Sequence, residues 1–180
     1  MDIDLEQLKY PIGKFEAPAE ISDRVLKGYI SDIRYLPSLI EIVVQSLDEA
    51  QLATPYRPEG WAVYQVVHHL VDSHTQALTR FKWALTEDNP VIKAYNESAW
   101  AELPDVKKTP INVSLTLLHA LHTRWVNLMD NLTPEQWART FVHPESGKTI
   151  ALRTLAGTYS WHGRHHLAQV ERLKERNNWH

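Results

Sequence analysis

The architecture of this chain follows from residues 61–87, WAVYQVVHHLVDSHTQALTRFKWALTE. The apolar residues of this stretch recur at steps of three and four, which is the period of one face of an α-helix. They are Val63, Val66, Val67, Leu70, Ala77, Leu78, Phe81 and Leu85. The stretch therefore predicts one long amphipathic helix, whose apolar face has to be buried against other elements.

Three further segments share this helical period. From Ile21 the apolar positions 26, 30, 33, 40, 44 and 47 mark one helix face, and Pro37 occupies the missing position, which predicts a kinked or two-piece helix. The other two helices are expected over about residues 113–131 and 150–176. Four amphipathic helices without an alternating strand pattern predict an all-α fold, a four-helix bundle in a single domain over residues 1–180.

Two segments of this domain lack a long helical period. Residues 1–20 contain two prolines and are expected to form an extended arm that lies on the domain. Residues 88–112 contain three prolines and only a short helical pattern near ESAWAEL, which predicts a long loop between the second and third helices. Loops of this length tend to be functional, and with Tyr95 and Trp100 this one is a candidate lid or dimer contact.

Two smaller features follow the third helix. In TPEQW, residues 133–137, Thr133 and Gln136 form a capping box with a proline at the first helical position, so a short helix is expected there. The next segment, FVHPESGKT, is expected to be a loop with a turn at Gly147.

The composition excludes several classes of protein. Nineteen Lys and Arg stand against 22 Asp and Glu with no basic run, which argues against nucleic acid or an anionic membrane as a partner. The chain has no cysteine, so any metal ion has to be held by nitrogen and oxygen ligands. The acidic N-terminal segment lacks the apolar core of a signal peptide, and no apolar run approaches the roughly 18 residues of a membrane span. A cytoplasmic protein is expected.

The last predicted helix contains three histidines, within WHGRHHLAQVERL, residues 161–173. His162 and His166 fall on or beside the apolar stripe and are four residues apart, so both rings can bind one ion. His165 points away from the stripe and is expected to be solvated. Gly163 lies next to the pair, which indicates a close approach of another group, because a glycine inside a helix costs about 1 kcal/mol relative to alanine.

A third ligand is needed, and the second helix offers three histidines in HHLVDSH, residues 68–74. His68 lies opposite the apolar stripe, His69 on its flank and His74 near its centre. The period alone favours His74 as the buried residue, where it would be a hydrogen-bonded core histidine. The flank position suits His69 for reaching across a helix seam, and the pattern leaves the choice open.

Seven motifs make the chain similar to the YfiT subgroup of the DinB-like superfamily, which is described as a group of metal-dependent hydrolases. They are YPIGKF, LATPYRPEGW, VVHHLVDSH, RFKWALTEDNP, LHTRW, HPESGK and WHGRHHLAQ, between about Tyr10 and Trp179. The resemblance implies a DinB-like four-helix bundle, a homodimer, and a Zn²⁺ or Ni²⁺ ion bound by His69, His162 and His166. Two positions depart from the family pattern: Ala62 replaces a threonine, and Gln169 replaces a histidine.

Three imidazole ligands would leave a divalent ion with an open coordination position, as in catalytic zinc sites. Zinc in such a site lowers the pKa of a bound water to about 7 and polarises carbonyl groups. The expected function is therefore a metal-dependent hydrolase, most simply with Zn²⁺, acting on a small-molecule substrate. No glutamate lies between His162 and His166 to act as general base. His122, on the inner face of the third helix, is the candidate for proton transfer or for supporting a ligand, and a hydrogen-bonded core histidine is the alternative.

Three other residues are candidates for substrate binding. Gln76 and Arg80 share the flank of His69 and could bind an anionic or amide-bearing substrate, although Arg80 also fits a surface ion pair. Tyr159 faces inward and could offer its hydroxyl, although plain packing explains it as well.

Two further functions fit the same metal site. One is a transferase that joins a low-molecular-weight thiol, such as bacillithiol, to an electrophile, as members of the wider superfamily do, because a bound cation can deprotonate a thiol. The other is a non-catalytic metal-binding stress protein.

Overall fold

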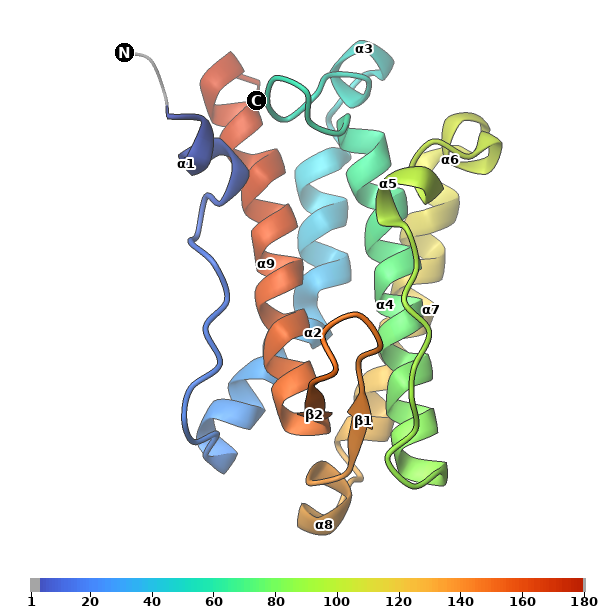
Figure 1. The fold of residues 1–180 in the computed structure, drawn as a ribbon. Helices are drawn as coiled ribbons and strands as arrows, with labels where there is room; N and C mark the ends of the chain where they lie inside the picture. The colour runs from blue at the N-terminus through green and yellow to red at the C-terminus, as the bar shows by residue number, and fades with distance from the viewer. Residues whose placement is uncertain (1–3, 180) are drawn as a thin grey trace.

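Four long helices lie side by side in the computed structural model, which describes residues 4–179 (Figure 1). They are α2 (Asp23–Val44), α4 (Val63–Thr86), α7 (Ile111–Met129) and α9 (Leu152–Asn177). α2 and α4 each pack against both α7 and α9, so α2 and α4 stand at opposite corners of the bundle. The predicted four-helix bundle is confirmed. In the described part of the chain, no helix combines the length and apolarity of a membrane span.

Short elements precede the first long helix and connect each long helix to the next. They are α1 (Leu5–Lys9), α3 (Glu49–Leu52), α5 (Glu97–Trp100), α6 (Pro104–Lys108), α8 (Pro134–Trp137), β1 (Thr140–Val142) and β2 (Thr149–Ala151). β1 and β2 pair antiparallel, with Phe141 opposite Ile150. The short helix expected after Thr133 is confirmed as α8, with both bonds of its capping box present.

The N-terminal arm differs in part from the prediction. Residues 1–3 of the predicted arm lie outside the described residues. The arm contains the short helix α1, because the side chain of Asp4 accepts a hydrogen bond from the Glu6 N–H and caps it. It then runs along α9 (Figure 1), where Trp161 donates a hydrogen bond to the Gly13 carbonyl at 3.0 Å.

Two segments expected to be loops contain regular structure. Residues 88–112 hold α5 at the expected place and also α6, which the sequence pattern did not indicate. The segment around Gly147 is the turn of the hairpin β1–β2, and the positive φ of +63° at Gly147 is the reason a glycine suits the turn. Three-residue strands are too short for an alternating pattern to reveal them.

α2 continues through Pro37 as one helix and does not divide into two pieces. Proline has no N–H, so the carbonyl of Ile33, four residues earlier, receives no hydrogen bond from position 37. That carbonyl instead accepts a hydrogen bond from Nδ1 of His122 on α7, at 2.6 Å. Pro37 thus leaves a backbone acceptor of α2 free to bind a side chain inside the bundle.

The buried apolar side chains of the described chain form two clusters. Along each of α4, α7 and α9, one end of the helix contributes to the first cluster and the other end to the second. The buried apolar residues that flank the boundary between the two clusters are Val71 and Ala77 on α4, Leu118 and Trp125 on α7, and Tyr159 and Leu167 on α9. His74, His122 and His162 occupy the gaps between these pairs. A layer of histidines therefore separates two apolar halves of the core.

At Gly163, α9 packs closely against α2. A Cβ atom at this position would lie 2.4 Å from Cδ2 of Leu36. The close approach predicted from the sequence is confirmed, and the approaching group is a core leucine.

Gly163→Ala is expected to lower the free energy of unfolding by about 1–3 kcal/mol, because the added methyl group overpacks this contact. Gly28, exposed on α2 with no atom near its Cβ direction, is the matched control. Gly28→Ala should stabilise the protein by up to about 1 kcal/mol through helix propensity. Denaturant unfolding of both variants measures the difference. Equal effects at the two glycines would contradict the packing argument.

Candidate metal centre

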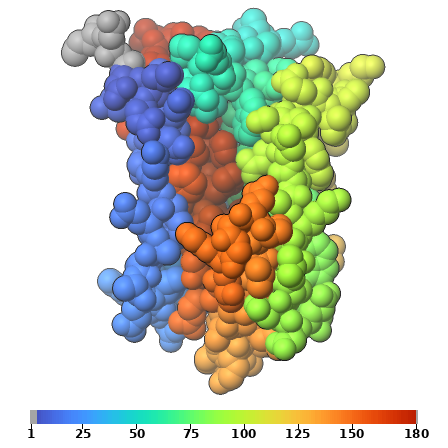
Figure 2. All heavy atoms as spheres, in the orientation of Figure 1, coloured from blue at the N-terminus to red at the C-terminus, as the bar shows by residue number. Residues whose placement is uncertain are grey.

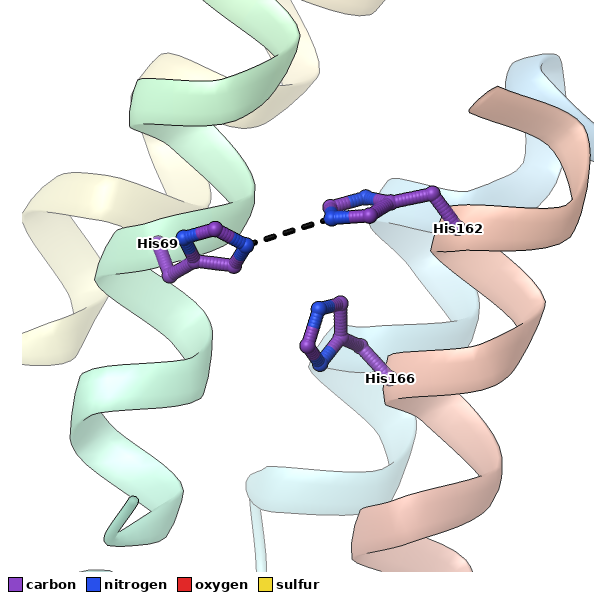
Figure 3. A group of neighbouring side chains, drawn as sticks. All are labelled: His69, His162 and His166. Atoms are coloured by element: carbon purple, nitrogen blue, oxygen red, sulfur yellow. Dashed lines mark hydrogen bonds between the residues drawn. The ribbon is translucent and has the colours of Figure 1, made fainter. Parts of the chain in front are cut away.

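Three histidines converge from two helices, His69 from α4 and His162 and His166 from α9 (Figure 3). One ring nitrogen from each lies within 4.8 Å of the others, and the Nε2 atoms of His69 and His162 are 3.1 Å apart. Two nitrogens bound to one tetrahedral zinc ion at about 2.0–2.1 Å would be about 3.4 Å apart. The spacing therefore suits three ligands of one divalent ion.

All three imidazoles are held in the neutral form, which is the form that binds metals. Burial lowers the pKa of His69 to about 4. Burial, together with repulsion from the neighbouring histidines, lowers the pKa values of His162 and His166 well below 6.5.

A chain of hydrogen bonds, here called the histidine relay, supports His162 from behind. Nδ1 of His162 lies 3.1 Å from Nε2 of His74, and Nδ1 of His74 lies 2.9 Å from Nε2 of His122. Nδ1 of His122 bonds the Ile33 carbonyl, which can only accept, so the hydrogen must be on Nδ1. Burial lowers the pKa of His122 to about 4, so it is neutral and its Nε2 accepts from His74.

The relay determines which nitrogen of His162 is free. Since Nδ1 of His74 donates to His122, Nε2 of the neutral His74 must accept from Nδ1 of His162. The lone pair of His162 is then on Nε2, the atom that faces His69. The carbonyl of Ile33 on α2 thus sets the tautomer of an imidazole on α9.

Gln169 supports His166 in a similar way. Its Nε2 donates to the Lys9 carbonyl at 3.1 Å and to Nε2 of His165 at 2.9 Å, so its Oε1 is the atom that faces His166. Oε1 accepts from Nδ1 of His166 at 2.8 Å, which leaves Nε2 of His166 free. Sequence reasoning noted Gln169 only as a departure from the family, although its place three residues after His166 was a signal that the two could bond.

Two sequence predictions about neighbouring histidines were wrong. His165, expected to be solvated, is only 6% exposed, because Trp161 stacks on its ring at 4.7 Å and Tyr10 of the N-terminal arm packs nearby. His68, expected opposite the buried face, is also buried, and its Nδ1 bonds Ser114 of α7 at 2.7 Å. In both cases a distant segment covers the helix face that the local pattern leaves bare.

The other candidates lie around the three histidines at different distances. His122 does not line their cavity and reaches them through the histidine relay. Gln76 is half-buried and is not among the lining residues either. Arg80 is buried and not on the surface, and it donates to the Tyr159 hydroxyl at 3.4 Å.

The three histidines open into a cavity of about 640 Å³. Its walls include Lys9 and Tyr10 of the arm, Arg57 and Trp61 of the loop before α4, and Glu97 of α5. Figure 2 shows the opening as a recess between the arm, this loop and residues 88–112, with α9 at its floor.

Glu97 is a functional candidate that the sequence reasoning missed. It was hidden in a proline-rich segment with no period, and no spacing relates it to the histidines. Glu97 lines the cavity and is exposed overall, and partial desolvation of its carboxyl group raises its pKa, although the nearby Arg80 opposes the rise. A carboxylate residue therefore lines the same cavity as the histidines without being part of a histidine motif.

The metal-free protein is expected to lose stability as the pH falls from about 6.5 to 4. Histidines of the unfolded chain take up protons near pH 6.5, whereas His69 and His122 stay neutral in the folded protein until about pH 4. Across this window the unfolded state binds more protons than the folded state. Each histidine that stays neutral in the folded protein therefore lowers the free energy of unfolding by about 1.4 kcal/mol for every unit by which the pH falls. Urea unfolding of chelator-treated protein at pH 7.5, 6 and 5 tests this. A constant free energy of unfolding across the window would show that these histidines are not buried as neutral groups.

The fold and the site define a class: a four-helix bundle with a buried three-histidine cluster between two of its helices. The sequence model that represents the DinB superfamily matches residues 33–170 of this chain, so the chain belongs to the DinB superfamily. The resemblance found in the sequence motifs is confirmed.

Relatives match over nearly the full length. A protein of Bacillus mycoides (strain KBAB4) is 50% identical over 175 residues, covering 97% of this chain and all of the relative, and is named "Putative metal-dependent hydrolase". A protein of Bacillus cereus (strain 03BB102) with the same description is 49% identical over the same length.

The solved structure of YfiT from Bacillus subtilis superposes with a TM-score of 0.94 at 41% identity, covering 97% of this chain and 99% of YfiT. That protein is described as "a probable metal-dependent hydrolase with an unusual four-helix bundle topology".

Proposed function

We propose that this protein is a metal-dependent hydrolase whose divalent ion is bound by His69, His162 and His166. The observation that carries the proposal is the convergence of three neutral imidazoles at the floor of a cavity wide enough for a small molecule. A donor set of three imidazole nitrogens suits Zn²⁺ and also accepts Ni²⁺. The names of the relatives support the same class of function.

The ion, when bound, supplies Lewis-acid activation of water and of the carbonyl group that is attacked. The residues of the chain do the rest. The histidine relay and Gln169 keep the ligand nitrogens unprotonated and aimed at one point. Glu97 is the group placed to accept the proton of the attacking water, because its carboxylate lines the same cavity. Its raised pKa brings it closer to the range that suits a general base.

The experiment that tests this function is a screen of metal-loaded protein against esters, amides, and pairs of a thiol with an electrophile. Metal-dependent hydrolysis of an ester or amide is the expected result. Turnover of thiol pairs alone would identify a thiol transferase, and full metal content without any turnover would identify a non-catalytic metal-binding protein. Either of those results would overturn the hydrolase proposal.

The role of Glu97 is tested in the same screen. Glu97→Gln should keep the metal content and lower hydrolysis by about 10²–10⁴-fold, the usual contribution of a general base. Glu102→Gln is the matched control, because Glu102 is an exposed partner of Lys107 on the same segment and does not line the cavity.

A further inference from the structure

A second cavity, of about 250 Å³, adjoins the metal centre. It shares two lining residues with the larger cavity, the proposed ligand His162 and the carboxylate Glu97. Its remaining walls come from α4, from α9 and from the hairpin β1–β2. A molecule that occupies the second cavity is therefore next to the proposed ion.

Arg80 brings a buried positive charge without an ionic partner to this cavity. Its side chain lines the cavity, it is only 9% exposed, and among residues 4–179 it forms no ion pair. Its Nε atom is buried and has no hydrogen-bond partner in the described chain. A buried guanidinium without a direct ion pair is destabilising, which favours the binding of an anionic ligand.

The groups around Arg80 compensate this charge only in part: Glu97 lines the same cavity and feels the charge of Arg80, but forms no direct ion pair with it. Tyr159 donates its hydroxyl hydrogen to the Ser73 carbonyl at 3.0 Å. Its oxygen accepts a long hydrogen bond of 3.4 Å from Arg80, which is a neutral contact and brings no negative charge. Nδ1 of His143, which lines the cavity, is also buried without a partner in the described chain. Two side chains with unpartnered buried nitrogens, Arg80 and His143, therefore line one cavity, which suits a ligand with hydrogen-bond acceptors.

We propose that this second cavity is a carboxylate-binding subsite. Arg80 binds the carboxylate of a substrate whose reacting carbonyl group lies at His69, His162 and His166. This inference rests on the proposed hydrolase function and names its substrate class: short-chain esters or amides that carry a free carboxylate.

Charge and shape favour a carboxylate over a phosphate. Arg80 supplies a single positive charge, and Glu97 on the same cavity offsets part of it, so the cavity cannot balance the two negative charges of a phosphate monoester. The planar fork of an arginine also matches the two oxygens of a carboxylate. Phe141, Ile150 and Leu155 form an apolar wall, which suits a short hydrocarbon chain between the two ends of the substrate.

An NMR titration tests the subsite with butyrate as the probe. Butyrate should shift the Nε–H resonance of Arg80, whereas butyramide, the neutral isostere, and inorganic phosphate should bind at least about tenfold more weakly. Equal binding of butyramide would refute a charge-dependent subsite. Tighter binding of phosphate would refute the carboxylate assignment.

Arg80→Met should weaken butyrate binding by at least about tenfold, and Arg172→Met, at an exposed residue paired with Glu175, should leave it unchanged. Arg80→Met should also raise Tm in the absence of butyrate, because it removes an unpaired buried charge. Unchanged butyrate affinity with a lower Tm would make Arg80 a structural residue and overturn the inference.

A metal-free variant separates this inference from the hydrolase proposal. In His69→Ala, butyrate binding that still depends on Arg80 would support the subsite whether or not the protein hydrolyses any substrate. The opposite result is that butyrate fails to bind His69→Ala, while Arg80→Met in the metal-loaded protein binds butyrate as the natural protein does. Butyrate would then bind the ion alone, and the subsite would be wrong.

Discussion

His162→Ala is expected to remove the metal from the protein. In the proposed site His162 supplies one of three ligand nitrogens, and two imidazoles alone are expected to bind a divalent ion too weakly to keep it through dialysis. Elemental analysis should give a metal-to-protein ratio that falls from near one toward zero. His69→Ala and His166→Ala should behave in the same way, because the three residues act as one ligand set.

The matched control is His119→Ala. His119 is a half-exposed histidine on α7 whose Nε2 bonds Glu41 at 2.9 Å, away from the metal centre. This variant should keep the metal ratio of the natural protein, and the Tm of each variant shows that it is folded. Equal metal content in His119→Ala and the three ligand variants would refute the ligand assignment.

His122→Phe is expected to lower metal affinity by about 10–100-fold, although His122 does not touch the ion. Phenylalanine breaks the histidine relay, so neither the Ile33 carbonyl nor His122 continues to set the tautomer of His74. Nδ1 of His162 then loses its defined acceptor, and its hydrogen is free to move to Nε2, the nitrogen that the metal needs. Competition with a chelator of known affinity measures the loss.

A structural effect of this substitution is separated from the tautomer effect in two ways. His119→Phe makes the same change three residues earlier on α7, at a half-exposed histidine that bonds Glu41 and is not part of the histidine relay, and should leave the affinity unchanged. In metal-free protein with ¹⁵N-labelled histidine, the chemical shifts of His162 should show the hydrogen on Nδ1 in the natural protein and a mixture of tautomers in His122→Phe. Unchanged shifts and unchanged affinity would reduce His122 to a core residue.

The positions of His162 and His166 were predictable from the sequence, but the choice of His69 was not. Residues four apart on one helix share a face in any fold, so the pair on α9 needed no tertiary information. On α4 the helical period favoured His74 as the buried residue, and His74 is indeed fully buried. It serves as the support of His162 because α7 places His122 on its other side. Only the family resemblance pointed to His69.

The environment of His165 shows the limit of a local pattern. Its angle on α9 is outward, as the period requires, yet the N-terminal arm and Trp161 cover it. The same arm supplies the Lys9 carbonyl that orients Gln169. Since the arm has no period of its own, nothing in its composition revealed that it completes the support of His166.

The amino-acid sequence alone determined the four helices, their apolar faces and the paired histidines of α9, because side-chain spacing along a helix is a property of the local chain. Tertiary structure decided which histidine of α4 joins that pair, that Arg80 is buried beside it, and that the carbonyl of Ile33 reaches it through His122 and His74. These links, including the one between His69 and His162, join residues 48 to 93 positions apart in the chain. They depend on how helices pack across the bundle, and no short-range period carries that information.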